Sequence, residues 1–115
     1  MRIVFAGNPE PALLTLQELQ KHHTIVAVIT SPARPQGRGQ KVAHSKVAEF
    51  ALQQNIPLIE TANINTDERV EALEYDLGVV VAFGQRIGER LLGKTKWMNV
   101  HYSLLPRWRG AAPVQ

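Results

Sequence analysis

Asn99 and His101 are the residues of this sequence whose types and spacing best suit a chemical reaction. Residues two apart on a β-strand point the same way, about 6.6 Å apart along it, so an amide and an imidazole would face one site. An Asn amide can donate to an oxygen that develops negative charge, and a His can transfer a proton near neutral pH. The pair suits acyl transfer to an amine through a tetrahedral oxyanion. A polar pair that only closes a strand end is the alternative.

The turn at Phe5–Pro9 follows the first expected strand, at the sheet edge where α/β proteins bind ligands. It contains Gly7 alone, whereas a dinucleotide-binding fingerprint needs three Gly residues. Pro9 and Pro11 remove N–H groups from the first turn of the next helix, and Glu10 adds a negative charge there. Each change weakens a phosphate site, so a nicotinamide-dependent dehydrogenase is disfavoured.

Two segments that contain Arg are candidate contacts for a nucleic acid. The run 107–109, Arg-Trp-Arg, could hold a base or a phosphate by stacking and charge, or be a surface loop with a packed Trp. In Ala33–Lys41, Arg38 lies between Gly37 and Gly39, which let the backbone approach a partner closely. A solvated loop is the alternative there.

The composition excludes several classes of protein. The chain has 115 residues, 44% of them hydrophobic, with no Cys and a net charge of +3. The lack of Cys excludes a disulfide framework, a thiol nucleophile and a Cys-ligated metal, and the spacing of the His residues does not suit a metal either. The hydrophobic runs are too short for a membrane span or a signal peptide. We therefore expect a cytoplasmic globular protein that binds neither a metal nor a membrane.

Charge is unevenly distributed along the sequence. No acidic residue lies between Glu18 and Glu49 or after Glu89, and each of these two stretches holds five Lys or Arg residues. The range 49–89 holds eight of the ten acidic residues. Two basic segments could meet a polyanion, but clustering in sequence need not mean clustering in space, so solvated surface charge is the simpler interpretation.

Short hydrophobic runs alternate with stretches of helical spacing. Strands are expected at Arg2–Gly7, Thr24–Thr30, Pro57–Ile59, Leu77–Phe83 and Met98–Tyr102. Helices are expected around residues 89–92 and after three suitable N-cap residues, Asn8, Ser45 and Asn65. The stretch Ser31–His44 contains two Pro and two Gly, so no regular structure is expected in it.

Continuous hydrophobic strands that alternate with helices are typical of a parallel sheet covered on both faces. The expected fold class is therefore α/β, a Rossmann-like parallel sheet with helices on both faces. The strand that carries Asn99 and His101 is expected to be the last strand of this chain, at an unfinished side of the fold.

Four segments, taken together, resemble one known family. They are FAGNP at Phe5–Pro9, ARPQGRGQK at Ala33–Lys41, VVVAFG at Val79–Gly84 and NVHYSLLPRWRGAAPVQ at Asn99–Gln115. In this order they resemble the amino-terminal part of methionyl-tRNA formyltransferases, over nearly the whole chain. The Asn-x-His and Ser-Leu-Leu-Pro elements are shared with folate-dependent formyltransferases in general. The Arg-Pro-x-Gly-Arg-Gly loop and the Arg-Trp-Arg-Gly-Ala-Ala-Pro segment are more particular to the tRNA enzymes.

The resemblance implies transfer of a formyl group from 10-formyltetrahydrofolate to the α-amine of methionyl initiator tRNA, in translation initiation. It implies that Asn99 steadies the formyl oxygen and that His101 serves the oxyanion and the proton transfer. The folate-binding residues that it implies are Phe83, Gly84, Gln85, Arg86, Ile87, Ser103, Leu104, Leu105 and Pro106. The tRNA-binding residues that it implies are Arg34, Arg38 and Lys41.

Two features depart from the family pattern. Asn8 stands where Thr or Ser is common, and no Asp follows Asp76, although the family has a third catalytic Asp downstream of the Asn–His pair. We therefore expect residues 1–115 to be the amino-terminal part of a formyltransferase domain, with no second domain, in a truncated chain that is inactive by itself. The whole enzyme is expected to be a monomer, and this part to self-associate where hydrophobic surface is exposed.

Two other functions fit parts of the sequence. A formyltransferase that acts on a small amine, such as a sugar nucleotide or glycinamide ribonucleotide, would need no contact with an acceptor stem, so the Gly-Arg-Gly loop argues against it. A non-catalytic α/β module that binds nucleic acid would keep the scaffold without the folate site. Folate binding therefore distinguishes the module from the enzymes.

Overall fold

The computed structural model describes residues 1–8, 10–32, 34–36, 41–100 and 112–113. Within them, one sheet has the strand order β5-β2-β1-β6-β7-β8. Its strands are β1 Arg2–Gly7, β2 Thr24–Thr30, β5 Leu58–Glu60, β6 Leu77–Val81, β7 Lys96–Asn99 and β8 Ala112–Pro113. Five neighbouring strands pair in parallel, in the order β5, β2, β1, β6 and β7, whereas β8 pairs antiparallel with β7. The expected parallel α/β sheet is thus confirmed.

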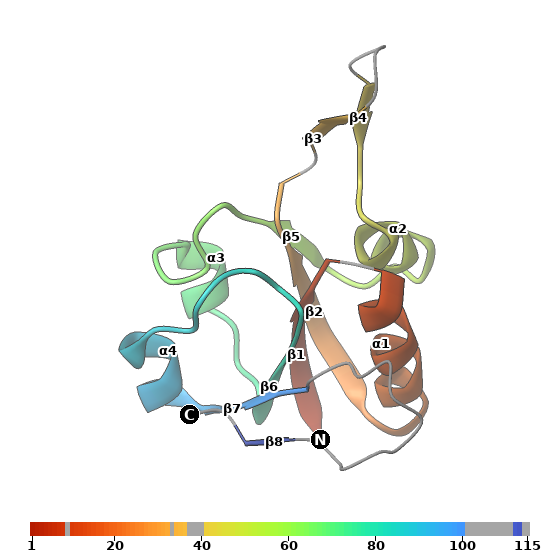
Figure 1. Ribbon diagram of the computed structural model, residues 1–115. Coiled ribbons are helices and arrows are strands. Elements are labelled where there is room, and N and C mark those ends of the chain that lie inside the picture. The colour runs from red at the N-terminus through yellow and green to blue at the C-terminus, as the bar shows by residue number, and fades with distance from the viewer. Residues whose placement is uncertain (9, 33, 37–40, 101–111, 114–115) are drawn as a thin grey trace.

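Helices cover both faces of this sheet. Figure 1 shows α1 (Glu10–His22) and α2 (Lys46–Gln53) on one face, and α3 (Glu68–Glu71) and α4 (Glu89–Lys94) on the other. Each face has its own buried hydrophobic cluster, the first with side chains of α1 and α2 and the second with side chains of α3 and α4. None of the described helices is long and hydrophobic enough to cross a membrane.

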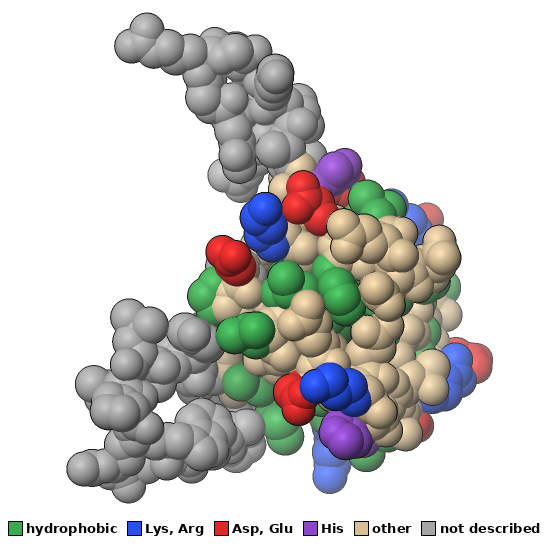
Figure 2. Space-filling model, turned by 90° about the vertical axis from the view of Figure 1, so that its right-hand side faces the viewer, with side chains coloured by type: hydrophobic (Ala, Val, Ile, Leu, Met, Phe, Trp, Pro, Cys, Tyr) green, Lys and Arg blue, Asp and Glu red, His purple; other side chains and the backbone are tan. Residues whose placement is uncertain are grey.

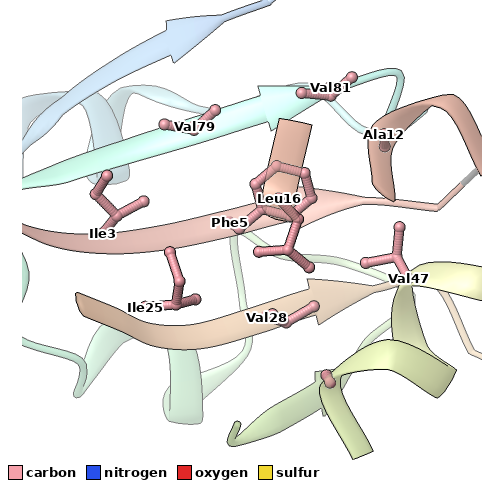
Figure 3. Packing of buried hydrophobic residues seen from close by; sticks show 10 residues of the cluster. Ile3, Phe5, Ala12, Leu16, Ile25, Val28, Val47, Val79 and Val81 are labelled. Atoms are coloured by element: carbon pink, nitrogen blue, oxygen red, sulfur yellow. The ribbon is translucent and has the colours of Figure 1, made fainter. Parts of the chain in front are cut away.

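Strand β1 shows why the hydrophobic runs are continuous. Ile3 and Phe5 pack toward Leu16 of α1 (Figure 3), whereas Val4 and Ala6 join the cluster on the opposite face. Successive side chains of a strand point to opposite faces, so a strand buried on both sides needs hydrophobic residues at every position.

Strand β2 carries an irregularity that its sequence does not reveal. Ile25 and Val28 belong to the same cluster although they are three residues apart, which a regular strand would not allow. The register with β1 shifts at this point, because Ile3 pairs with Ile25 but Val4 pairs with Ala27. One extra residue in β2, as in a β-bulge, brings both side chains to one face.

Some expected element boundaries are wrong by a few residues. The strand expected to reach Phe83 ends at Val81, and Ala82 follows with a φ of 47°. The strand expected at 98–102 runs from Lys96 to Asn99. A positive φ is unfavourable for a non-Gly residue and incompatible with a strand, so the chain turns at Ala82 despite its hydrophobic sequence.

One of the expected helix caps is confirmed, and the structure places the side chains of the other two elsewhere. Ser45 caps α2 as expected, because its hydroxyl accepts from the Ala48 N–H at 3.1 Å. Asn65 does not cap α3, since Asp67 takes that position and accepts from the Arg69 N–H at 2.9 Å. Helix α1 begins at Glu10, two residues after Asn8, whose side chain binds neighbouring loops. An Asn amide in reach of several backbone groups bonds to those that the tertiary fold presents.

The expectation that 31–44 lacks regular structure is also wrong. Strands β3 (Arg34–Gln36) and β4 (Lys41–Ala43) pair antiparallel, with Arg34 opposite Ala43 and Gln36 opposite Lys41. This two-stranded ribbon stands away from the main sheet (Figure 1). Each strand of a two-stranded ribbon has an open edge, so Pro35 is tolerated despite its missing N–H.

The Asp67 cap makes a pH-dependent contribution to stability. The Arg69 guanidinium bonds to both Asp67 oxygens, at 3.0 and 2.7 Å, and holds the pKa of that carboxyl well below its ordinary value. A lowered folded-state pKa stabilises the protein above the ordinary Asp pKa, and the effect is lost as the pH falls. Asn caps helices about as well as Asp, so Asp67→Asn keeps the cap but removes the charge and one of the two acceptors for the Arg69 guanidinium. Thermal unfolding from pH 7 down to pH 3 should show wild type more stable at neutral pH and the difference shrinking with acid. A difference that stays constant over this range would contradict the prediction.

Candidate functional site

The strand order reverses at one point of the sheet, between β1 and β6. From β1 the chain continues on one side to β2 and β5, and later returns to the other side of β1 to form β6 and β7. In open parallel sheets, ligands bind outside the carboxyl ends of the strands where the order reverses in this way. Here these are the ends of β1 and β6, so the loops after Gly7 and Val81 form the candidate site.

Asn8 joins the loops that follow three strands at this edge. Its amide NH₂ donates to the Phe83 carbonyl at 2.8 Å and to the Ser31 hydroxyl at 3.2 Å, and its oxygen accepts from the Ser31 N–H at 2.7 Å. Phe83 follows β6 and Ser31 follows β2. Asn is well suited to this position because its amide donates and accepts at once, whereas a hydroxyl is shorter and has a single proton.

The segment Phe83–Ile87 contains the expected folate-binding residues of the β6–α4 loop. Phe83 is buried and packs in the second hydrophobic cluster, and Ile87 packs partly against that cluster. Gly84 is exposed with a φ of 87°, and Arg86 is exposed. The segment therefore has buried hydrophobic anchors near its two ends and leaves the backbone of Gly84 exposed between them.

Gln85 uses its side chain inside the protein. Its amide NH₂ donates to the Thr61 carbonyl at 2.9 Å, and its oxygen accepts from the Ile64 N–H at 2.7 Å. Thr61 and Ile64 lie on the loop between β5 and α3. The amide of Gln85 therefore links two loops, and a ligand at this site would meet the main chain of Gln85 more readily than its side chain.

Asn65 makes the reciprocal contact from the β5–α3 loop. It donates to the Arg86 carbonyl at 2.8 Å and accepts from the Gly88 N–H at 2.7 Å. The sequence pattern at Asn65 predicts a helix cap and gives no sign of this role. Its partners lie 21 and 23 residues away, so no local pattern marks them.

Asn99 lies at the same edge of the sheet as these loops. It is the last residue of β7 and is half-buried, and it pairs with Val80, one residue before the end of β6. The Val100 N–H continues the pairing with a bond to the Val80 carbonyl at 2.8 Å. Parallel pairing brings Asn99 level with the start of the β6–α4 loop, as the sequence-based hypothesis of a common site requires.

The expectation that the strand carrying Asn99 would be the last strand of this chain is wrong. β8 lies outside β7, with Asn99 opposite Ala112 and Met98 opposite Pro113. The antiparallel contact needs the chain to reverse after Asn99, which hydrophobic periodicity cannot predict. His101 and the expected folate-binding residues Ser103, Leu104, Leu105 and Pro106 lie outside the described residues.

The comparisons with known proteins decide the family. The whole chain, residues 1–115, matches the sequence profile of the family described as formyl transferase. The chain belongs to the formyl transferase family. Within this family it is similar to three proteins named methionyl-tRNA formyltransferase, all of which are aligned with 100% of this chain. It is 45% identical over 126 residues to that of Corynebacterium efficiens and covers 40% of it. It is 47% identical over 122 residues to that of Mycobacterium sp. strain KMS, covering 40%, and 45% identical over 121 residues to that of Coxiella burnetii strain RSA 331, covering 38%.

The formyl transferase chain thus spans about 40% of the length of these relatives. The suspected resemblance and the fold class are confirmed by the match and by the sheet. The roles expected for individual residues stay predictions, because neither the fold nor the match assigns a role to a side chain.

A polar contact links the residue that follows the β3–β4 ribbon of this family member to the main sheet. His44, which follows β4, lies 2.8 Å from a carboxylate oxygen of Glu60 at the end of β5. Arg69 donates to the Glu60 carbonyl at 3.0 Å. Of the expected tRNA contacts, Arg34 and Lys41 lie on β3 and β4, and Arg38 lies outside the described residues.

The described surface shows how charge is distributed on one face of the protein. On the face that carries α1 and α2, charged side chains of both signs are interspersed (Figure 2), with Lys21 paired to Glu18 and Lys46 to Glu49. This face therefore does not present a uniformly basic surface to a polyanion. Among the described residues, no group of three or more His, Asp or Glu side chains could hold a metal ion.

Proposed function

We propose that this chain forms the folate-binding and Asn–His part of an enzyme that moves a formyl group from 10-formyltetrahydrofolate to the α-amine of methionyl initiator tRNA. The observation that carries the proposal is the position of Asn99. In a formyl transferase chain, it lies level with the β6–α4 loop at the edge where the strand order reverses. The names of the relatives support the choice of acceptor.

The proposed chemistry assigns a separate task to each residue of the pair. The α-amine attacks the formyl carbon, the carbonyl oxygen gains negative charge, and the bond from carbon to the folate N10 then breaks. The Asn99 amide donates to that oxygen, which stabilises the charge as it develops. His101 takes part in moving the proton that leaves the amine toward the departing nitrogen, because imidazole exchanges protons near neutral pH.

The β6–α4 loop supplies the folate site in this proposal. The backbone at the exposed Gly84 offers N–H and C=O groups to a flat heterocycle with donors and acceptors on its edge, whereas the Arg86 carbonyl is already bound by Asn65. Phe83 anchors the start of the loop in the second cluster. The residues Ser103, Leu104, Leu105 and Pro106 complete the site in the prediction from the sequence.

The β3–β4 ribbon supplies the contact with tRNA in this proposal. It stands away from the main sheet (Figure 1), and Arg34, Arg38 and Lys41 belong to it or to the segment that joins its strands. A projecting basic ribbon can reach the backbone of an acceptor stem while the reacting amine lies at the sheet edge. A small amine acceptor would not use such a ribbon.

A formyl-transfer assay tests the proposal on the chain extended to the full length of its relatives. Methionyl initiator tRNA, a sugar-nucleotide amine and glycinamide ribonucleotide are each supplied with 10-formyltetrahydrofolate. We expect formylation of the methionyl-tRNA, with a kcat/KM for the tRNA far above that for either small amine. Preference for a small amine would favour the alternative acceptors, and nucleic-acid binding without folate binding would favour the non-catalytic module.

The tRNA contact gives a separate prediction. Arg38→Ala in the same enzyme should lower kcat/KM for methionyl-tRNA by the loss of one phosphate or base contact, about 1–3 kcal/mol, and leave folate binding intact. The control is Lys46→Ala, which removes an exposed basic residue of α2 outside the ribbon. Unchanged kinetics for Arg38→Ala, or an equal loss for both variants, would contradict the assignment.

A further inference from the structure

The β6–α4 loop has little regular structure of its own to hold its shape. Between Val81 and Glu89 the chain forms neither strand nor helix, and it turns through positive φ values at Ala82 and Gly84. A ligand that binds main-chain groups needs those groups held to within about 0.5 Å. Contacts from outside the loop must therefore fix its backbone.

Two side-chain amides provide these contacts in a reciprocal arrangement. Gln85, on the β6–α4 loop, binds the backbone of Thr61 and Ile64 on the β5–α3 loop. Asn65, on the β5–α3 loop, binds the backbone of Arg86 and Gly88. Each amide donates with its nitrogen and accepts with its oxygen, so both ends of both side chains are used. We call this set of four hydrogen bonds the amide clasp.

The packing around Gly88 shows how closely the clasp fits. A Cβ atom at Gly88 would lie 2.9 Å from the Asn65 side-chain oxygen, closer than carbon and oxygen normally approach. Glycine at this position therefore lets the Asn65 oxygen reach the Gly88 N–H at 2.7 Å. A larger residue would push Asn65 away and break the clasp on this side.

Asn65 is itself held in place by its own loop. Its N–H donates to the Asn63 side chain at 3.0 Å, and the Asn63 N–H donates to the Thr61 hydroxyl at 3.2 Å. Thr61 is buried, and its N–H bonds to the Thr30 carbonyl at the end of β2. The clasp is therefore connected to the main sheet rather than to a free loop.

We infer that Asn65 and Gln85 are positioning residues for the folate site, and that they act through the backbone of the loop between them. Asn8 holds the Phe83 carbonyl at the start of the loop, and the clasp holds Gln85, Arg86 and Gly88 further along. Between these points lie the groups offered to the folate ring. This inference rests on the proposed function, and it assigns the Gln85 side chain to positioning rather than to direct contact with the ligand.

The two halves of the clasp can be weakened one bond at a time. Asn65→Asp keeps the acceptor for the Gly88 N–H but turns a carboxylate oxygen toward the Arg86 carbonyl, which repels it, and Gln85→Glu keeps the acceptor for the Ile64 N–H but does the same to the Thr61 carbonyl. Asn65→Ala and Gln85→Ala remove both bonds. Gln53→Ala is the matched control, because it removes an exposed amide at the end of α2.

Steady-state kinetics with both substrates tests the inference in the full-length enzyme. For Asn65→Ala and Gln85→Ala we expect the KM for 10-formyltetrahydrofolate to rise about tenfold, roughly the effect of one hydrogen bond. The KM for methionyl-tRNA should stay near that of wild type. The Asp and Glu variants should raise this KM at least as much, because a carboxylate oxygen then faces a backbone carbonyl, and the double Ala variant should lose less than the product of the single effects. Gln53→Ala should change nothing.

Amide hydrogen exchange gives a second measurement that does not depend on activity. The Gly88 N–H should exchange faster in Asn65→Ala, and the Ile64 N–H in Gln85→Ala, while both stay protected in Gln53→Ala. An unchanged folate KM in both Ala variants would overturn the inference alone. A parallel rise of both KM values with a matching fall in the unfolding temperature would also overturn it, because the amides would then act only on stability. A wild-type enzyme without folate-dependent transfer would overturn the inference together with the proposed function.

Discussion

Turnover should fall about 100-fold or more when Asn99 is replaced by Ala in the enzyme extended to the length of its relatives. The amide is proposed to donate to an oxygen that becomes charged only in the transition state, and loss of one such donor typically costs about 100- to 1000-fold in kcat. Asn99 ends β7 beside Val80 of β6, so its position depends on the central sheet rather than on its own side chain. Folding should therefore change little.

Single-turnover rates and the KM values for both substrates separate this effect from a loss of binding. Lys96→Ala is the matched control, since Lys96 is exposed at the other end of β7. His101→Ala should lower turnover to a similar extent. Near-normal turnover in either the Asn99 or the His101 variant, or an equal loss with Lys96→Ala, would show that the pair does not act at the transition state.

The largest effect on stability is expected at Gly78, the second residue of β6. A Cβ atom at Gly78 would overlap the indole ring of Trp97, its neighbour on β7, which is itself buried. The ring also stacks edge to face on Tyr75, with centroids 5.8 Å apart, so it has little freedom to move aside. Gly78→Ala should lower the free energy of unfolding by about 2–3 kcal/mol, in the upper part of the range for overpacked cores.

Chemical denaturation of both variants measures this effect. Gly93→Ala is the control, because a Cβ atom at Gly93 meets nothing within 4 Å in helix α4, and it should be neutral or slightly stabilising. Combining Gly78→Ala with Trp97→Leu should cost less than the sum of the two single variants, since the smaller side chain leaves space for the methyl group. Strict additivity, or a Gly78 variant as stable as the Gly93 variant, would rule out the clash.

The sequence alone determined the elements whose signals are local. β1 and β2 agree with their expected bounds, because each is a continuous hydrophobic run between residues that break or cap structure. Ser45 was identified as a cap because its partner, Ala48, lies three residues away. The parallel sheet with helices on both faces followed from the alternation of such runs, and the family from motifs that stand in sequence order.

Tertiary structure decided the features that depend on distant partners. Asn8 and Asn65 both have the sequence signal of a helix cap, yet they bind groups 75 and 21 residues away at Phe83 and Arg86. The antiparallel partner of β7 and the β3–β4 ribbon likewise depend on which strand edges meet. An amide or a strand edge can satisfy its hydrogen bonds with many partners, and the energies of these choices differ little locally. The folded sheet selects among them, because it determines which donors and acceptors lie within 3 Å of one another.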